Sequence, residues 1–320
     1  MGLPKGVGEW KTDLPYDTVS RSFFKKFSGN AAKIREFGNL AFCRDARKME
    51  GELFLPMFRE NCEKRGVMNT VFLAAGYATR LYPLTRDFPK PLLTVGGKAI
   101  LDRLLDDLAL TGRVTRCAVV TNGKFAPAFR SWSAQNDFPV PIEIVDDGTL
   151  SNETRLGAVN DLLLVMEQLN LSGPTFVAAG DNLLDFSLSR FLDYGRQGET
   201  NCLMRYFEPD ENRLRRCGVL ELGEEDRVIS MEEKPEHPRS HWCVPPFYLY
   251  RDLTAEKVRR ALNEGCGGDA PGSFAAWICA NEPARAMEMP GRRFDIGTVE
   301  SYRECCRLFE EPNEKGENRD

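Results

Sequence analysis

One stretch, from Val71 to Leu93, constrains the fold more than any other part of this 320-residue chain. It reads VFLAAGYATRLYPLTRDFPKPLL and opens with five apolar residues, a run typical of a buried parallel strand. The run breaks at Gly76, where the chain enters a loop. In an open α/β sheet, ligands bind beyond the carboxyl ends of the parallel strands. The stretch therefore predicts a buried strand followed by a ligand-binding loop.

The loop has the composition of a phosphate site. Its first residues include Gly76, Ala78 and Thr79, which are small enough for backbone N–H groups to approach phosphate oxygens. Arg80 adds a planar guanidinium fork, and Lys90 adds a point charge on backbone that is restricted by a proline on each side. These residues predict that the loop binds a polyphosphate.

The order of the specified residues is also informative. Ala-Ala-Gly-x-x-Thr-Arg-Leu is followed by Pro-Leu-Thr and then by Pro-Lys-Pro-Leu, and this order resembles the pyrophosphorylase loop of the sugar-1-phosphate nucleotidylyltransferases. The chain departs from the commonest form of that loop at Ala78, where a second glycine is usual. The Gly-x-Gly-x-x-Gly pattern of dinucleotide-binding folds is absent from this loop. The resemblance implies that the nucleotide is bound by Leu73, Ala74, Ala75, Gly76, Tyr77, Ala78 and Thr79.

A second loop, from Asp146 to Gly157, follows another predicted strand. From the residues alone, a polar loop ending in a helix cap at Asn152 or Thr154 explains it. The resemblance adds that Gly157 begins a helix that packs against the nucleobase and that Asn152 supplies a base-reading amide. The base itself stays open among CTP, UTP and dTTP.

Two carboxylates are candidate metal ligands. Asp181 follows the predicted strand Thr175–Ala179, where a carboxylate either caps a turn or holds Mg²⁺ that bridges phosphate oxygens. Far downstream, the segment Arg293–Thr298 resembles the second metal-binding segment of the family. The resemblance implies a Mg²⁺ ion held by Asp181 and Asp295.

The segment Met231–Pro235 reads Met-Glu-Glu-Lys-Pro, which by itself indicates only a solvated charged edge. Its setting resembles the acceptor-binding segment of the family. The resemblance implies that Lys234 binds the acceptor phosphate and acts in catalysis with Arg80 and Lys90. It also implies that Glu233 and Tyr248 contact the acceptor.

Aromatic residues near this segment leave two interpretations of the acceptor open. Pro245 and Pro246 stand where many relatives have a small residue and a glycine, which puts the usual sugar contacts in doubt. The nearby aromatic residues either belong to the core or line a pocket for a cationic headgroup through cation–π contacts; they are Trp242, Phe247, Tyr248 and Trp277. A headgroup pocket would suit phosphocholine or an aminoalkyl phosphonate.

The pattern of strands and helices predicts the fold. Predicted strands and helices alternate, which favours an α/β protein with a doubly wound, mostly parallel sheet and helices on both faces. The predicted strands are Val71–Ala75, Ala118–Val120, Ile142–Val145 and Thr175–Ala179, and the predicted helices include Ala126–Gln135 and one from near Thr154. The resemblance implies a Rossmann-like nucleotidyltransferase domain over residues 70–310. We expect a helical N-terminal extension at 1–69 and a disordered charged tail at 311–320.

Composition excludes several classes of function. A net charge of -5 gives no general attraction to nucleic acid or to an anionic membrane. The sequence has neither a membrane-length apolar run nor a secretory leader, which predicts a cytoplasmic protein. The ten cysteines include no CxxC pair, so reduced thiols are expected. His237 and His241, with Cys243 nearby, could suggest zinc, but a polar loop is the favoured interpretation.

The resemblance implies a Mg²⁺-dependent nucleotidyltransferase that couples an NTP to a sugar-1-phosphate and releases pyrophosphate. One alternative is a cytidylyltransferase that activates phosphocholine or an aminoalkyl phosphonate such as 2-aminoethylphosphonate with CTP. Another is a non-catalytic regulatory subunit that senses nucleotide. The N-terminal extension could supply a dimer contact, so a homo-oligomer also stays open.

Overall fold

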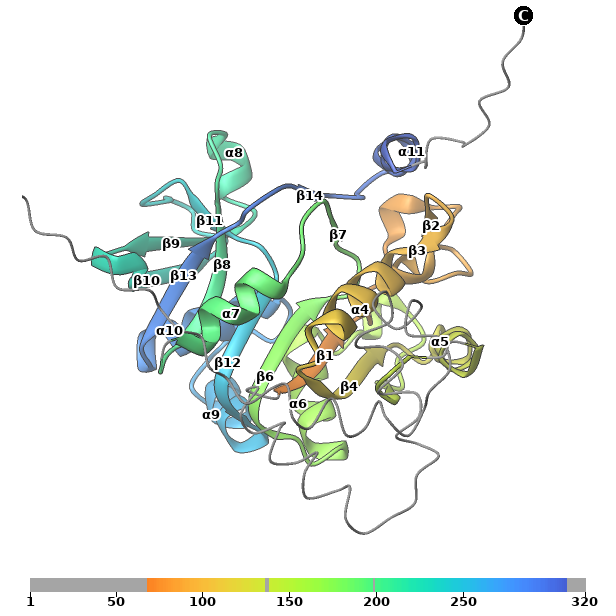
Figure 1. Ribbon diagram of the computed structural model, residues 1–320, viewed down its shortest axis with the longest axis horizontal. Helices are drawn as coiled ribbons and strands as arrows, with labels where there is room; N and C mark the ends of the chain where they lie inside the picture. The colour runs from red at the N-terminus through yellow and green to blue at the C-terminus, as the bar shows by residue number, and fades with distance from the viewer. Residues whose placement is uncertain (1–67, 136–137, 198, 310–320) are drawn as a thin grey trace, which may run out of the picture. The chain divides into compact units, whose positions relative to one another are not determined.

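The computed structural model describes residues 68–309, apart from residues 136–137 and 198 (Figure 1). The predicted N-terminal extension lies outside the described residues except for its last two, Met68 and Asn69, which belong to the first strand. The predicted charged tail also lies outside them. Within the described residues, no helix is long and apolar enough to cross a membrane.

The strands of the main sheet are β1 (Met68–Leu73), β4 (Val114–Thr121), β5 (Ile142–Asp146), β6 (Ser172–Ala179), β8 (Asn201–Phe207), β9 (Gly218–Leu222), β10 (Val228–Glu233), β11 (Trp242–Val244), β12 (Phe247–Thr254) and β13 (Ala284–Glu288). Two short strand pairs lie outside the main sheet. In one, β2 (Thr94–Val95) pairs with β3 (Lys98–Ala99), and in the other, β7 (Leu183–Leu184) pairs with β14 (Arg293–Phe294). The α-helices are α4 (Ile100–Thr111), α5 (Ala126–Gln135), α6 (Ala158–Gln168), α7 (Ser189–Gln197), α8 (Glu211–Leu214), α9 (Ala255–Asn263), α10 (Pro271–Asn281) and α11 (Val299–Leu308).

The main sheet has a parallel part and an antiparallel part. Its strand order is β10-β9-β11-β8-β12-β6-β1-β4-β5, with β13 paired to β8. The neighbours β6, β1, β4 and β5 pair in parallel, whereas β12 pairs antiparallel with both β6 and β8. The predicted doubly wound sheet is confirmed for its central strands, and the remaining strands make the sheet a mixed one.

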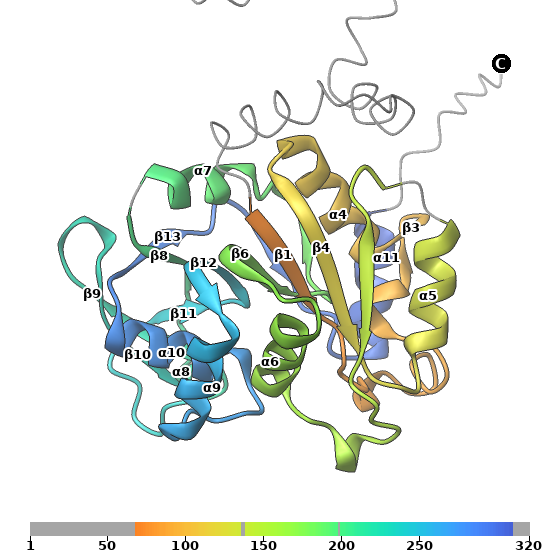
Figure 2. The same cartoon turned by 90° about the horizontal axis from the view of Figure 1, so that it is seen from below.

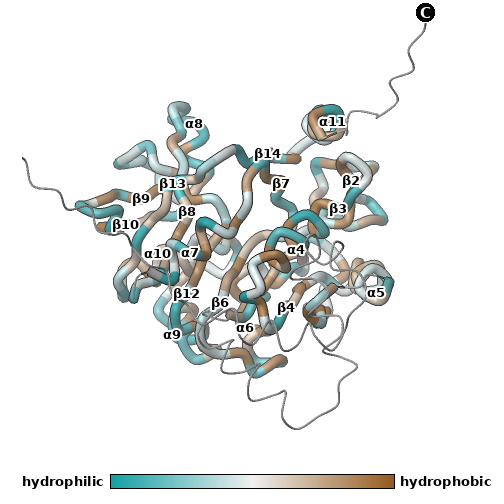
Figure 3. The backbone as a smooth tube through the Cα atoms, in the orientation of Figure 1, coloured by the Kyte–Doolittle hydropathy of each residue, from teal (hydrophilic) through white to brown (hydrophobic). Residues whose placement is uncertain are grey.

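Helices cover both faces of the sheet because the buried strands carry apolar residues on both sides. Val71 of β1 packs in one hydrophobic cluster with residues of α6, α9 and α10. The next residue, Phe72, packs in a second cluster with residues of α4, α5 and α7. This alternation follows the two-residue period of a strand. Figures 1 and 2 show α4 and α6 on opposite sides of β1 and β4. In Figure 3 the tube is mainly hydrophobic along β6 and mainly hydrophilic along α8.

The four strands predicted around the nucleotide loop are all present, and α5 has the predicted bounds. The helix predicted from near Thr154 begins later, at Ala158. Residues Asn152–Thr154 instead form a short 3-10 helix, so the predicted cap at Asn152 or Thr154 is wrong. Gly157 is the residue that caps α6.

Gly157 can occupy this cap because it has no side chain. Its φ is +92°, a conformation that other residues adopt only under strain. A Cβ atom there would lie 2.6 Å from the backbone oxygen of Gly268 and 2.8 Å from the Cα of Asp269. The same segment accepts hydrogen bonds from the first N–H groups of α6, Ala158 to Asp269 at 3.0 Å and Val159 to Gly268 at 2.9 Å. Close backbone packing therefore fixes where α6 begins.

We predict that Gly157→Ala lowers the free energy of unfolding by more than Gly173→Ala. Gly173 has nearly the same φ, +90°, but no atom lies within 4 Å of the Cβ it would gain. Both variants carry backbone strain on the order of 1–3 kcal/mol, and only Gly157→Ala adds the steric clash. Denaturant unfolding of both variants measures the difference. Equal losses would contradict the packing argument.

Candidate active site

A cavity of about 460 Å³ opens at the carboxyl ends of β1 and β6. Parallel pairing brings these ends together, since Leu73 lies opposite Ala179 and accepts a 2.9 Å hydrogen bond from the N–H of Gly180. The cavity is lined by the loop after β1, by the start of α6 and by residues that follow β6 and β14. The predicted site residues among its lining are Leu73, Ala74, Ala75, Gly76, Tyr77, Ala78, Thr79, Arg80, Lys90, Asn152, Gly157, Asp181 and Asp295.

Hydrogen bonds from neighbouring elements hold the loop after β1. The side-chain amide of Asn122 donates to the backbone oxygen of Ala75 at 2.9 Å, and the hydroxyl of Thr85 donates to that of Ala78 at 2.8 Å. The Tyr77 hydroxyl lies 3.1 Å from the hydroxyl of Thr149. Ala78 has left-handed backbone angles, φ 47° and ψ 44°, which explains why glycine is usual at this position. The loop is thus pre-shaped before any ligand binds.

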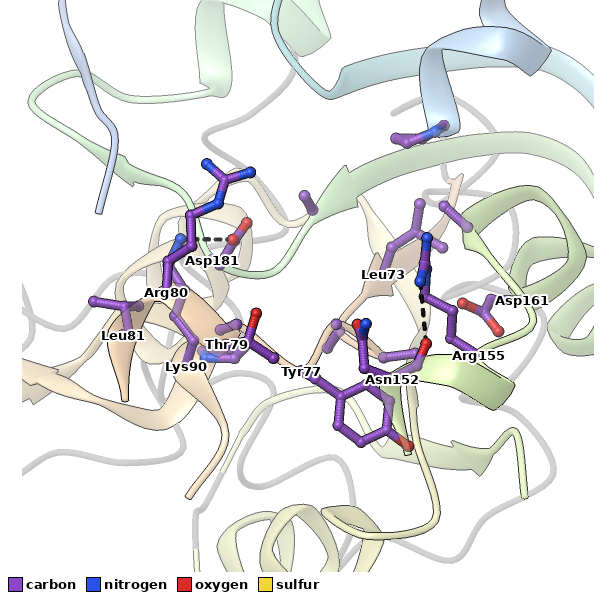
Figure 4. A pocket seen from close by; sticks show the side chains of 18 of the residues that line it. Leu73, Tyr77, Thr79, Arg80, Leu81, Lys90, Asn152, Arg155, Asp161 and Asp181 are labelled. Carbon is purple, nitrogen blue, oxygen red and sulfur yellow. Dashed lines mark hydrogen bonds and ion pairs between the residues drawn. The ribbon is translucent and has the colours of Figure 1, made fainter. Parts of the chain in front are cut away.

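Lys90 and Asp181 form an ion pair in the cavity. The Lys90 side chain is only 10% exposed, and its Nζ lies 2.8 Å from Oδ2 of Asp181 (Figure 4). Burial alone would raise the pKa of Asp181, but the adjacent Lys90 and the charge of Arg293 hold this pKa below its ordinary value. Asp181 is therefore ionised at neutral pH, and a buried lysine is placed directly at the strand end.

The chemistry of this end of the cavity suits a hard cation and phosphate groups. Asp295 lines the same cavity and is exposed, and among the described residues it has no ion-pair partner. Arg80 is likewise exposed and without an ion pair in this part of the chain. Ionised carboxylates are the ligands that Mg²⁺ prefers, usually completed by substrate phosphates. The residues present fit a magnesium ion shared with a polyphosphate.

The other end of the cavity has a different character. Figure 4 shows Leu73, Asn152, Arg155 and Asp161 grouped on one side and Arg80, Lys90 and Asp181 on the other. The Arg155 side chain already has partners within the protein. Its Nε lies 3.0 Å from Oδ1 of Asp269, and its Nη1 donates a hydrogen bond to the backbone oxygen of Asn152. Arg80, Lys90 and the candidate metal ligand Asp181 are therefore concentrated at one end.

The predicted acceptor residues do not line this cavity. Lys234 is exposed at the end of β10, with a left-handed φ of 51°, and its N–H donates to the backbone oxygen of Cys217 at 3.0 Å. Glu233 is partly buried against Gly272 at the start of α10. Tyr248 is buried in the core with its ring stacked on Tyr250. The structure therefore brings together the nucleotide and metal residues but not the acceptor residues.

The aromatic residues that could have formed a headgroup pocket are either buried or in contact with arginine side chains. Phe247 and Tyr248 are buried. The ring of Trp242 faces the guanidinium of Arg205 at 4.8 Å, and that of Trp277 faces Arg260 at 5.7 Å. The core interpretation describes these side chains better than a cation–π pocket does.

Zinc is not supported at the histidines. Nδ1 of His241 lies 2.8 Å from the backbone oxygen of Glu208, and its ring stacks on Phe207. Within the described part of the chain, no group of three or more His, Cys, Asp or Glu side chains could hold a metal ion. The eight cysteines in that part are free thiols.

Among the residues of the cavity wall that sequence reasoning missed are Arg155, Asp161, Asp269 and Pro271. Arg155 and Asp161 flank Gly157, so their place beside a predicted base-binding glycine was a usable signal. Asp269 and Pro271 reach the cavity only because residues 268–269 pack against the start of α6. No local pattern reveals that contact.

Comparison with known proteins gives the family. Residues 69–311 match a family described as Nucleotidyl transferase. A glucose-1-phosphate thymidylyltransferase from Mycolicibacterium smegmatis is 29% identical over 243 residues, which cover 73% of this chain and 79% of that protein. One from Neisseria meningitidis serogroup A is 27% identical over 244 residues, covering 75% and 81%. A structure of UDP-glucose pyrophosphorylase complexed with UDP-glucose has the same fold, with a TM-score of 0.63 at 20% identity, and the match covers 76% of this chain and 98% of that one.

The family match includes every segment that lines the cavity, from the loop after β1 to the segment after β14. The family resemblance predicted from the loop is thereby confirmed. The chain belongs to the nucleotidyl transferase family and is a nucleotidyltransferase.

Proposed function

We propose that this enzyme couples an NTP to a sugar-1-phosphate in a Mg²⁺-dependent reaction that releases pyrophosphate. The observation that carries the proposal is the pairing of Lys90 with Asp181 at 2.8 Å in a cavity that Arg80 and Asp295 also line. The thymidylyltransferase relatives support glucose-1-phosphate or a similar sugar phosphate as the acceptor.

The reaction needs no covalent enzyme intermediate. A phosphate oxygen of the acceptor attacks the α-phosphorus of the NTP, a new P–O bond forms, and the bond to the β-phosphate oxygen breaks to release pyrophosphate. Lys90 and Arg80 offset the negative charge on the α-phosphate and on the departing pyrophosphate. Asp181 and Asp295 would hold Mg²⁺, which supplies further charge stabilisation to the phosphates. The remaining contribution of the protein is to place the two substrates in line.

One segment of the wall links the nucleotide cavity to the predicted acceptor residues. Asp269 and Pro271 line the cavity, and the next residue, Gly272, lies against the carboxylate of Glu233. Burial raises the pKa of Glu233, and the neighbouring Lys234 opposes this shift. We infer that Lys234 and Glu233 receive the acceptor beside the segment Asp269–Gly272, with the Lys234 ammonium on the acceptor phosphate. Tyr248 would act behind them, as buried support.

The alternative acceptors have less support. A pocket for phosphocholine or an aminoalkyl phosphonate would need free aromatic faces, and Trp242 and Trp277 face arginines. A regulatory subunit would not need the Lys90–Asp181 pair together with Asp295 at one cavity end.

We predict that the full-length protein releases pyrophosphate when it is given Mg²⁺, one NTP and a sugar-1-phosphate. The measurement is pyrophosphate release across ATP, CTP, GTP, UTP and dTTP against a panel of sugar-1-phosphates, phosphocholine and 2-aminoethylphosphonate. Release with phosphocholine or the phosphonate alone would overturn the sugar acceptor. NTP binding without release for any acceptor would overturn the transferase proposal.

For the acceptor side, we predict that Lys234→Ala raises the KM for the sugar-1-phosphate more than the KM for the NTP, because the ammonium faces only the acceptor phosphate. The matched control is Lys98→Ala, which removes a partly exposed lysine that pairs with Asp106 outside the cavity. Steady-state kinetics with each substrate varied in turn measure both constants. A larger effect on the NTP would move Lys234 to the nucleotide side.

A further inference from the structure

Asp161 is a buried carboxyl in the cavity that the proposed mechanism does not use. It lies in the first turn of α6, is only 4% exposed and forms part of the cavity wall. Its Oδ1 atom is buried and has no hydrogen-bond partner among the described residues. Oδ2 of Asp147, in the loop after β5, is likewise buried and has no hydrogen-bond partner among those residues.

The two carboxyls belong together. The side chains of Asp161 and Asp147 are neighbours, and burial together with the charge of Asp147 raises the pKa of Asp161 to about 7. Burial also raises the pKa of Asp147, whose Oδ1 accepts the N–H of Thr149 at 2.7 Å. Two neighbouring carboxylates whose oxygens are buried, with no cation between them, cannot both be ionised easily. One proton shared between the two partnerless oxygens, Oδ1 of Asp161 and Oδ2 of Asp147, would relieve this repulsion.

A proton shared in this way would leave one oxygen of Asp161 free to face the cavity. Once Oδ1 of Asp161 is engaged with Asp147, the remaining oxygen, Oδ2, is the atom that is left for the cavity. This oxygen accepts hydrogen bonds and donates none, whichever of the two residues carries the proton. With one proton shared in this way, the Asp161–Asp147 pair would retain one negative charge and would present a hydrogen-bond acceptor to a ligand.

The position of the pair indicates which part of an NTP it meets. Asp161 lies with Leu73 and Asn152 at the end of the cavity away from Arg80, Lys90 and Asp181 (Figure 4). If the triphosphate occupies the cationic end, as the proposed function requires, the nucleobase reaches Asp161. Leu73 offers the base an apolar contact at the same end.

We propose that Asp161 is a base-specificity residue whose carboxyl accepts a hydrogen bond from an exocyclic amino group of the base. The enzyme therefore prefers CTP to UTP and dTTP. This inference rests on the proposed function. The N4 amino group of cytosine supplies such a donor. Uracil and thymine carry the acceptor O4 in its place, which would leave two acceptors facing each other in a buried site. Their N3–H is a donor, but it is flanked by two carbonyl oxygens that the negative pair repels.

The test measures equilibrium binding of CTP, UTP and dTTP, and then kcat/KM for each with the same sugar-1-phosphate. We expect the native enzyme to favour CTP by on the order of 10- to 100-fold, the usual effect of leaving a buried acceptor unpaired. Asp161→Asn should keep this preference, because the amide N–H replaces the shared proton toward Asp147 while the amide oxygen faces the cavity. Asp161→Leu should bring the three affinities to within a few-fold of one another.

The control is Asp146→Asn, which changes the neighbouring carboxyl that pairs with Arg130 outside the cavity and should leave the preference unchanged. Tighter native binding of UTP or dTTP than of CTP would overturn the proposal. So would a preference for CTP that survives Asp161→Leu or is lost in Asp161→Asn. Because binding is measured without acceptor, an Asp161-dependent preference for CTP without any turnover would overturn the proposed function and leave this inference standing.

Discussion

The ion pair between Lys90 and Asp181 is the contact on which the rest of the site depends. It joins a loop that follows β1 to the end of β6, two segments 91 residues apart in sequence. A lysine that is almost fully buried needs such a partner, because an unpaired buried charge is strongly unfavourable. The same pair keeps Asp181 ionised and holds a positive charge at the strand ends. In the proposed mechanism, the shape of the loop, metal ligation and phosphate binding therefore all depend on this one interaction.

Charge divides the cavity into two ends with different chemistry. The end with Arg80, Lys90, Asp181 and Asp295 favours phosphates and a divalent cation. The other end has the buried carboxyl of Asp161, and Arg155, which also lines the cavity, is already paired with Asp269. A nucleotide has the matching asymmetry, with an anionic chain at one end and a neutral base at the other. In the proposed mechanism, this match would orient the NTP before any specific base contact is made.

The sequence was informative wherever local chemistry sets the structure. The apolar runs identified β1, β4, β5 and β6, and the order of the loop residues pointed to the family that the comparison confirms. The start of α6 was placed too early because it depends on the backbone of residues 268–269, more than a hundred positions away. Tyr248 was assigned to the acceptor although its ring lies in the core against Tyr250. The neighbouring Asp161 and Asp147 were missed because neither residue is unusual until the fold brings a buried oxygen of each close together.

The central claim is that Asp181, poised by Lys90, couples metal binding to nucleotide binding. The most direct test is the equilibrium binding of an α,β-methylene NTP analogue with and without Mg²⁺. It compares the native protein with Asp181→Asn and with the control Asp193→Asn. Asp193 lies on α7, outside the cavity, and its carboxylate pairs with Arg113. The account predicts that Mg²⁺ raises the affinity by about tenfold or more, equivalent to about 1.4 kcal/mol, in the native protein and in Asp193→Asn but not in Asp181→Asn. An equal effect of Mg²⁺ in all three proteins would contradict it.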